Sequence, residues 1–117
     1  MKKHYYTLRP QPFNRIKEGR KKIGMRLFDD KRQNLKVGDV ICFTNTETNE
    51  ELNVEVLALT RFKDFNELYA AFTPLDLGYL EAETISPQDM EKYYSARQIM
   101  KFGVLAIRIK VLNSENV

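Results

Sequence analysis

Hydrophobic and polar residues alternate along several short stretches of the chain, the pattern expected of half-buried β-strands. We predict about five or six strands, the clearest lying at residues 4–8, 22–27, 40–43, 52–56 and 104–111; whether the fourth runs on to residue 62 stays open. From this alternation, and because residues 40–43 are apolar on both faces of their strand, we expect ten residues to be mostly buried: Ile23, Met25, Val40, Ile41, Phe43, Val54, Val56, Leu105, Ile107 and Ile109.

Helix signals are few and local. Pro10 and Pro12 are typical of a first helical turn, and Gly19 fits the residue after a helix C-cap. Capping boxes begin at Asp64 and Ser95, and a further helix start is predicted at residues 86–89. Because the strands do not alternate regularly with helices, the pattern favours a small barrel over a doubly wound parallel sheet. We therefore predict a mainly β or α+β fold, a small barrel with short flanking helices, as a single domain over residues 1–117.

Composition narrows the class of protein. The 117 residues, 43% of them hydrophobic, suffice for one core. No apolar run is long enough to span a bilayer, and no signal peptide is evident, so we expect a soluble cytoplasmic protein. With a single Cys42 and a single His4, one chain has neither an internal disulfide nor a usual zinc site. We expect no metal and no other cofactor; the oligomeric state stays open.

Charge is distributed unevenly along the chain. Residues 1–44 hold 12 Lys and Arg against 4 Asp and Glu, whereas residues 45–100 hold 4 against 11. This segregation favours a basic face and an acidic face, although interleaved strands would mix them. The basic half contains the run GRKKIGMR at residues 19–26, which indicates either a solvated strand or a site for an anionic partner.

Four segments together resemble the ASCH (activating signal cointegrator homology) domain, specifically a small bacterial branch. They are GRKKIGMR (19–26), LKVGD (35–39), LGYLEAETISPQDMEKYYS (77–95) and KFGVLAIRI (101–109). They occur in the family's order and spacing and cover nearly the whole chain. The resemblance implies a PUA-like β-barrel with flanking helices, which agrees with the strand pattern.

The resemblance also implies a cleft between barrel and helices, lined by a Gly-x-Lys-x-x-x-x-Arg motif. This motif falls on Gly19, Lys21 and Arg26. A glycine permits close backbone approach to a ligand, and Lys and Arg offer charge and donors to a phosphate or a base edge. Simple alternation, however, puts Lys22 rather than Lys21 on the same side as Arg26, so either lysine can be the one in the cleft.

Two functions remain open after this step, and whether the protein is an enzyme stays undecided. The leading one is binding of RNA or a nucleotide in the basic cleft, with Arg9, Tyr94, Glu81 and Glu83 as further candidates. The alternative is a small amidohydrolase acting on N4-acetylcytidine or a related acylated base, as in one bacterial ASCH branch that uses a Lys, a Thr and a distant Glu. Lys21 matches the Lys and Glu83 the Glu, with Glu81 as the near alternative, but Gly24 occupies the threonine position and has no hydroxyl.

Overall fold

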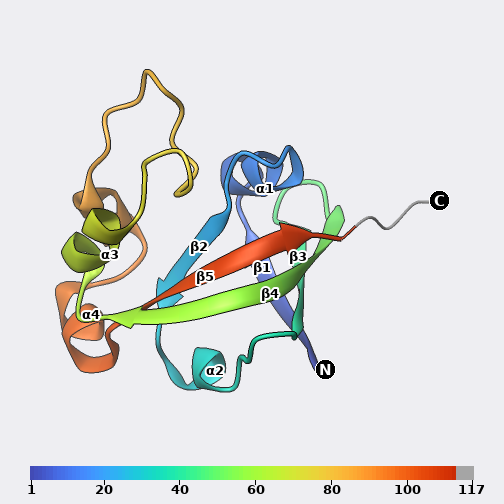
Figure 1. Ribbon diagram of the computed structural model, residues 1–117, viewed down its shortest axis with the longest axis horizontal. Helices are drawn as coiled ribbons and strands as arrows, with labels where there is room; N and C mark the ends of the chain where they lie inside the picture. Colours follow the sequence, from blue (N-terminus) through green and yellow to red (C-terminus); the bar gives the residue numbers. More distant parts are fainter. Residues whose placement is uncertain (113–117) are drawn as a thin grey trace.

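Five strands form one curled sheet in the computed structural model, which describes residues 1–112 (Figure 1). The strands are β1 (Lys3–Leu8), β2 (Ile23–Leu27), β3 (Val40–Asn45), β4 (Glu51–Phe62) and β5 (Val104–Val111). Their order in the sheet is β1-β3-β4-β5-β2, so the first two strands of the chain lie at the two edges. The predicted fold class is confirmed as a half-barrel with flanking helices, and the fourth strand does extend to Phe62.

The sheet is mixed, and a register shift bends one of its strands. β1 pairs with β3 in parallel, and the other three pairings are antiparallel. The register between β4 and β5 shifts between Val56 and Ala58, and such a bulge bends and twists a strand. The open side is bridged by side chains, because Arg26 and Lys31 donate to the backbone oxygens of Thr7 and Tyr5 on β1.

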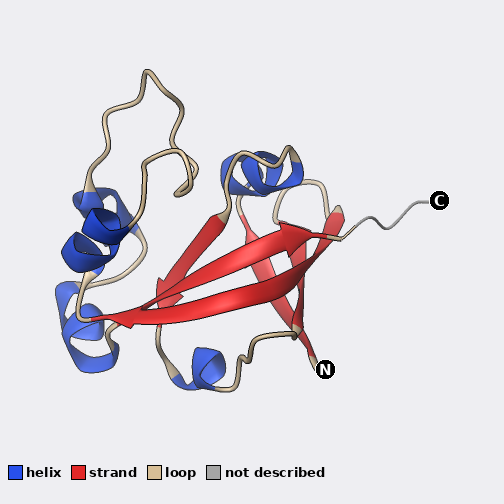
Figure 2. Ribbon diagram, viewed as in Figure 1, coloured by secondary structure: helices blue, strands red, loops and turns tan. Residues whose placement is uncertain are grey.

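The helices are short and lie around the sheet (Figure 2). They are α1 (Pro10–Lys17), α2 (Asp30–Gln33), α3 (Phe65–Ala71), the 3-10 helix η1 (Pro87–Lys92) and α4 (Ala96–Phe102). The caps predicted at Asp64, Ser86 and Ser95 are confirmed. Gly19 also follows the C-cap of α1 as predicted, with φ +80°, a left-handed conformation that favours glycine.

One helix was missed by the sequence pattern. No helix was predicted at residues 29–35, but Asp29 caps the single turn of α2 by accepting from the backbone N–H of Arg32 at 3.2 Å. A four-residue helix is too short to show hydrophobic periodicity, and α2 has no buried residue. Only the capping residue identifies it.

Hydrophobic residues form two clusters on opposite faces of the sheet. The first fills the inside of the half-barrel and includes Phe13, Phe43 and Ile107. The second lies under α3, η1 and α4 and includes Ile23, Leu68 and Val104. Strand β5 is therefore covered on both faces, whereas edge strands are covered less completely. Of the predicted core residues, only Met25 and Val40 are half-buried instead of buried.

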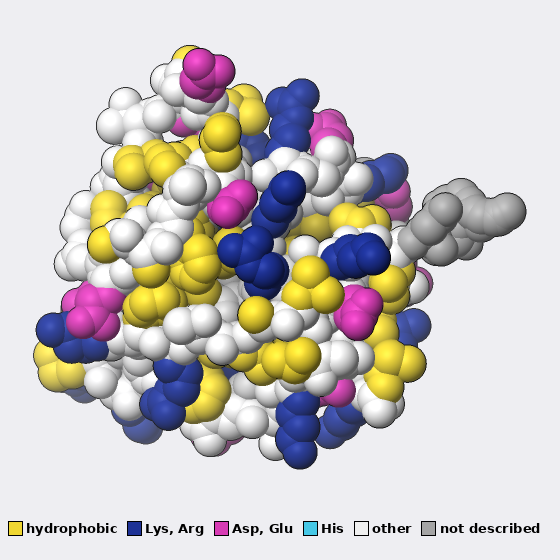
Figure 3. All heavy atoms as spheres, in the orientation of Figure 1, with side chains coloured by type: hydrophobic (Ala, Val, Ile, Leu, Met, Phe, Trp, Pro, Cys, Tyr) yellow, Lys and Arg dark blue, Asp and Glu magenta, His cyan; other side chains and the backbone are white. Residues whose placement is uncertain are grey.

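The surface does not separate by charge on the face shown in Figure 3, where basic and acidic side chains are interspersed. Loops bring segments of opposite net charge next to each other, so the segregation along the sequence is not reproduced on this face. Within residues 1–112, no helix has the length and apolar character needed to cross a membrane.

Candidate ligand-binding cleft

A cleft of about 490 Å³ opens between α1, the start of β2 and the long connection from α3 to η1. Figure 1 shows this connection as an extended excursion on the same side of the sheet as α1. The lining combines cations, aromatic rings and carboxylates: Arg9, Arg15, Lys21, Arg26 and Lys92; Tyr69, Tyr79, Tyr93 and Tyr94; Glu83 and Asp89. A volume of this size suits a small ligand such as a nucleotide.

Lys21 enters the cleft because of the loop that precedes β2. Its backbone N–H donates to Arg15 O at 3.0 Å, and the next two N–H groups, of Lys22 and Ile23, both donate to Asp76 O at 2.9 Å. The strand begins only at Ile23, so its alternation does not control Lys21. Lys21 therefore lines the cleft together with Arg26, whereas Lys22 is exposed and is not part of the lining.

The Lys21 side chain is closely packed. Its Nζ donates to Leu77 O at 2.8 Å, and its stem passes over Gly78, where an added Cβ would come within 2.8 Å of the Lys21 Cγ. Burial lowers the pKa of Lys21 to about 8, and the positive charges of Arg26 and Arg15 add to this effect. A substantial fraction of this amine is thus neutral slightly above neutral pH.

Arg26 forms part of the cleft floor. Its Nη2 donates to Thr7 O at 2.9 Å, and its guanidinium lies 5.2 Å from the centre of the Tyr6 ring. Burial lowers the pKa of Arg26, and the Tyr94 hydroxyl opposes this shift. Arg26 thus joins β2 to the edge strand β1 as well as lining the cleft.

Arg15 and Glu83 form a paired contact across the cleft. Arg15 Nη1 donates to Glu83 Oε1 at 3.0 Å and Nη2 donates to Oε2 at 3.2 Å. Arg15 Nη1 also donates to Gly78 O at 2.9 Å. The backbone N–H of Leu80 and then the Arg15 guanidinium lower the pKa of Glu83. Glu83 thus lines the cleft, and its side-chain partner there is Arg15.

Two tyrosines and a carboxylate form a hydrogen-bond chain on the opposite wall. The Tyr79 hydroxyl donates to Asp89 Oδ2 at 2.9 Å and lies 2.7 Å from the Tyr69 hydroxyl. Since Tyr79 has only one proton, Tyr69 must be the donor of the second bond. Burial raises the pKa of both tyrosines, so both hydroxyls stay protonated over the physiological range.

Arg9 and Tyr93 lie together at the cleft. The Arg9 guanidinium is 5.6 Å from the centre of the Tyr93 ring, which is 51% exposed. Tyr94, the aromatic residue chosen from the sequence, is half-buried and stacks on Phe65 with an interplanar angle of 13°. One face of Tyr94 is therefore covered by Phe65, whereas Tyr93 is the more exposed ring and has Arg9 over it.

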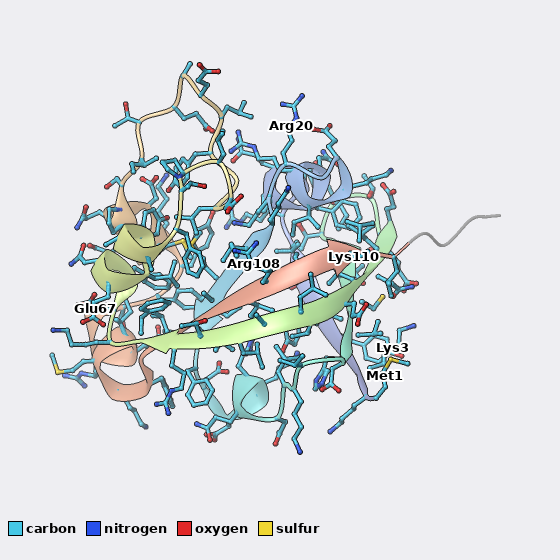
Figure 4. The ribbon with its side chains drawn as sticks, viewed as in Figure 1. Met1, Lys3, Arg20, Glu67, Arg108 and Lys110 are labelled. Carbon is cyan, nitrogen blue, oxygen red and sulfur yellow. The ribbon has the colours of Figure 1, made fainter. Side chains whose placement is uncertain are left out.

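Other candidates from the sequence lie outside the cleft. Gly19 and Glu81 are exposed and do not belong to the lining. Gly19 ends α1, and Arg20 beside it projects outward (Figure 4). Sequence reasoning missed Arg15, because a basic residue on a short helix normally faces solvent. It also treated Asp89 only as a helix-start residue, since nothing local indicates its contact with Tyr79.

Gly24 lines the cleft and leaves space at the position where a nucleophile was considered. A Cβ built there would meet its nearest atom, Ile107 O, at 3.8 Å, an ordinary contact distance. Within residues 1–112, no group of three or more His, Cys, Asp or Glu side chains is arranged to hold a metal ion. What the cleft offers is therefore fixed positive charge, hydrogen-bond donors and aromatic surface.

Comparisons with known proteins agree with this architecture. The family model of the ASCH domain matches residues 7–113. The hypothetical protein PH0355 is 28% identical, with 96% of this chain and 100% of that chain covered and a TM-score of 0.79. Protein PF0455 from Pyrococcus furiosus is 31% identical, with 94% and 97% covered and a TM-score of 0.70.

A more distant ASCH structure, from Zymomonas mobilis, is 15% identical, with 98% of this chain and 73% of that chain covered and a TM-score of 0.66. At that identity the likeness concerns the fold alone. No curated protein is similar enough in sequence to match the chain.

Proposed function

Because the chain belongs to the ASCH domain family, we propose that its cleft binds a nucleotide or a short single-stranded stretch of RNA. The observation that carries this proposal is the convergence of Arg9, Lys21 and Arg26 on one cleft that also presents the exposed ring of Tyr93. Cations hold phosphates without reading sequence, and an exposed aromatic ring can stack on a base. In this arrangement Tyr93 takes the stacking role that the sequence suggested for Tyr94.

The test is a titration of a labelled single-stranded RNA at several salt concentrations, followed by fluorescence anisotropy. The affinity should fall as the salt concentration rises. With roughly two to four phosphate contacts, the slope of the logarithm of the association constant against the logarithm of the salt concentration should be shallow. Replacing Arg9 with alanine should weaken binding and lower that slope by about one, because one phosphate contact is lost. Arg9 is exposed, so its removal should leave the fold intact.

The matched control is Arg20→Ala, which removes the same charge from an exposed residue that projects away from the domain (Figure 4). Arg20→Ala should bind like the wild type. Absence of RNA or nucleotide binding at low salt would refute the proposal. Equal losses in the Arg9 and Arg20 variants would show that binding depends on net charge and not on the cleft.

The alternative function, hydrolysis of N4-acetylcytidine or a related acylated base, draws support from Lys21. Its pKa of about 8 lets it accept a proton near neutral pH, as a general base must. Two observations speak against it: Gly24 supplies no hydroxyl, and the Glu83 carboxylate is bound to Arg15. Binding therefore remains the leading proposal.

Chromatographic detection of cytidine from the acetylated nucleoside tests the alternative. If the protein is such a hydrolase, the wild type should release cytidine and Lys21→Ala should not. If Gly24 is what prevents the reaction, Gly24→Thr should gain activity, because a Cβ at this position makes only ordinary contacts and the threonine supplies the missing hydroxyl. Strong hydrolysis by the wild type without RNA affinity would reverse the order of the two proposals.

A further inference from the structure

Arg15 is held in the cleft by two independent contacts. One is the hydrogen bond from Nη1 to Gly78 O at 2.9 Å, on a buried backbone segment. The other is the two-pronged contact with the Glu83 carboxylate. The Arg15 side chain is only 17% exposed, whereas that of Glu83 is 34% exposed. If Glu83 left, the bond to Gly78 O would still keep the guanidinium oriented.

Glu83 belongs to the more exposed part of the connection between α3 and η1. Residues 80–85 are all exposed, and Glu83 is fixed mainly by its own turn. Its Oε1 accepts from the Leu80 N–H at 2.6 Å, and its N–H donates to Leu80 O at 3.0 Å. A rotation of this side chain would therefore release Arg15 without moving the barrel or the helices.

Positive charge around Arg15 exceeds the negative charge that compensates it. Lys21 lies close enough to Arg15 and Arg26 for both to lower its pKa, and it donates only to the carbonyl of Leu77. Arg26 likewise donates to the carbonyl of Thr7. Within residues 1–112, Glu83 is the carboxylate paired with any of these three cations. An anion with more charge than a carboxylate would relieve more of their mutual repulsion.

A carboxylate held in a guanidinium fork has the geometry of a phosphate in the same fork. We propose that Arg15, with Lys21 beside it, is a phosphate-binding site of the cleft, which Glu83 occupies in the free protein. The inference rests on the proposed function, to which it adds the place of the phosphate: a bound nucleotide puts its phosphate on Arg15, displaces Glu83 and directs its base towards Tyr93.

The test uses inorganic phosphate as the probe, in calorimetric or NMR titrations at low ionic strength. Glu83→Gln keeps the shape of the side chain and an acceptor for Leu80 N–H, but it binds a guanidinium less strongly than a carboxylate does. We expect phosphate to bind about threefold to fivefold more tightly to this variant, in keeping with the modest strength of a partly exposed ion pair.

Glu81→Gln is the matched control. It removes the same charge two residues away in the same loop, from an exposed side chain outside the cleft lining. Its affinity for phosphate should stay within about twofold of the wild type, because exposed charges are screened by water and salt. Adding Arg15→Met to Glu83→Gln should abolish the gain. Thermal unfolding of each variant shows whether it remains folded.

The proposed site is refuted if Glu83→Gln binds phosphate no more tightly than Glu81→Gln, or if the gain survives Arg15→Met. A parallel RNA titration separates this result from the proposed function. If the wild type binds RNA but the two glutamate variants bind phosphate equally well, the proposed function holds and the phosphate site is refuted. If Glu83→Gln binds phosphate more tightly but no variant binds RNA, the phosphate site holds and the proposed function is refuted.

Discussion

Replacing Gly78 with alanine should show how strongly the long connection fixes Lys21. Gly78 has φ +98°, which costs a residue with a side chain about 1–2 kcal/mol. The new Cβ would also lie 2.8 Å from Cγ and 2.9 Å from Cβ of Lys21, near the root of that side chain, where it cannot easily move. Overpacking of this kind costs about 1–3 kcal/mol. We therefore expect Gly78→Ala to lower the free energy of unfolding by roughly 2–5 kcal/mol.

A shift of the connection between α3 and η1 away from β2 would relieve part of this overpacking. Lys21 would then lose its hydrogen bond to Leu77 O and its burial, so its pKa would rise from about 8 towards the ordinary value of 10.5. The free energy of unfolding from urea titrations measures the first effect. An NMR pH titration of the Lys21 ε-methylene group measures the second.

Gly38→Ala provides the control, since Gly38 has nearly the same φ, +94°, but no atom within 4 Å of an added Cβ. Its free energy of unfolding should fall only by the cost of the left-handed conformation, about 1–2 kcal/mol, and the pKa of Lys21 should stay unchanged. If both alanine variants lose the same stability and Lys21 titrates as in the wild type, close packing against Gly78 does not position Lys21.

Two further predictions concern pH. Between about pH 8 and 10.5 the unfolded chain keeps Lys21 protonated while the folded chain does not. Raising the pH in this window should therefore stabilise the wild type relative to Lys21→Met. If the difference in urea midpoint between the two proteins does not change with pH, the lowered pKa of Lys21 is contradicted. Asp39 has a pKa of about 2, below its usual 3.8, because His4 and the N–H groups of Lys2 and Lys36 bind its carboxylate. The stability from this contact is complete above pH 3.8 and is lost as the pH falls through about 2. The urea midpoint of Asp39→Asn should therefore change less with pH between these two values than the midpoint of the wild type does.

Most elements could be predicted from the sequence because their signals are local. The alternation of Leu105, Ile107 and Ile109 needs only neighbouring residues, and so does the capping box at Ser95. The prediction was wrong where the signal is too short, as at α2. It was incomplete where the partner is remote: Met25, expected in the core, is only half-buried and lines the cleft.

The site was predicted less completely for the same reason. Lys21, Arg26, Arg9 and Glu83 do line one cleft, and the spacing of the family motif pointed to two of them, Lys21 and Arg26. Strand alternation favoured Lys22 over Lys21, because it assumes that the strand begins before these residues, whereas β2 begins at Ile23. Contacts of their backbone with residues 15 and 76 put Lys21 in the cleft instead.

By itself the sequence determined the strand and helix segments, most of the buried set and the family, since these depend on periodicity, caps and ordered motifs within short stretches. Only the tertiary structure decided which charged groups meet. Arg15 and Glu83 are 68 residues apart, and Lys21 and Leu77 are 56 apart. The physical reason is that the direction of a long polar side chain depends on hydrogen bonds and desolvation by remote segments, whereas its place in a strand or helix depends on the residues beside it.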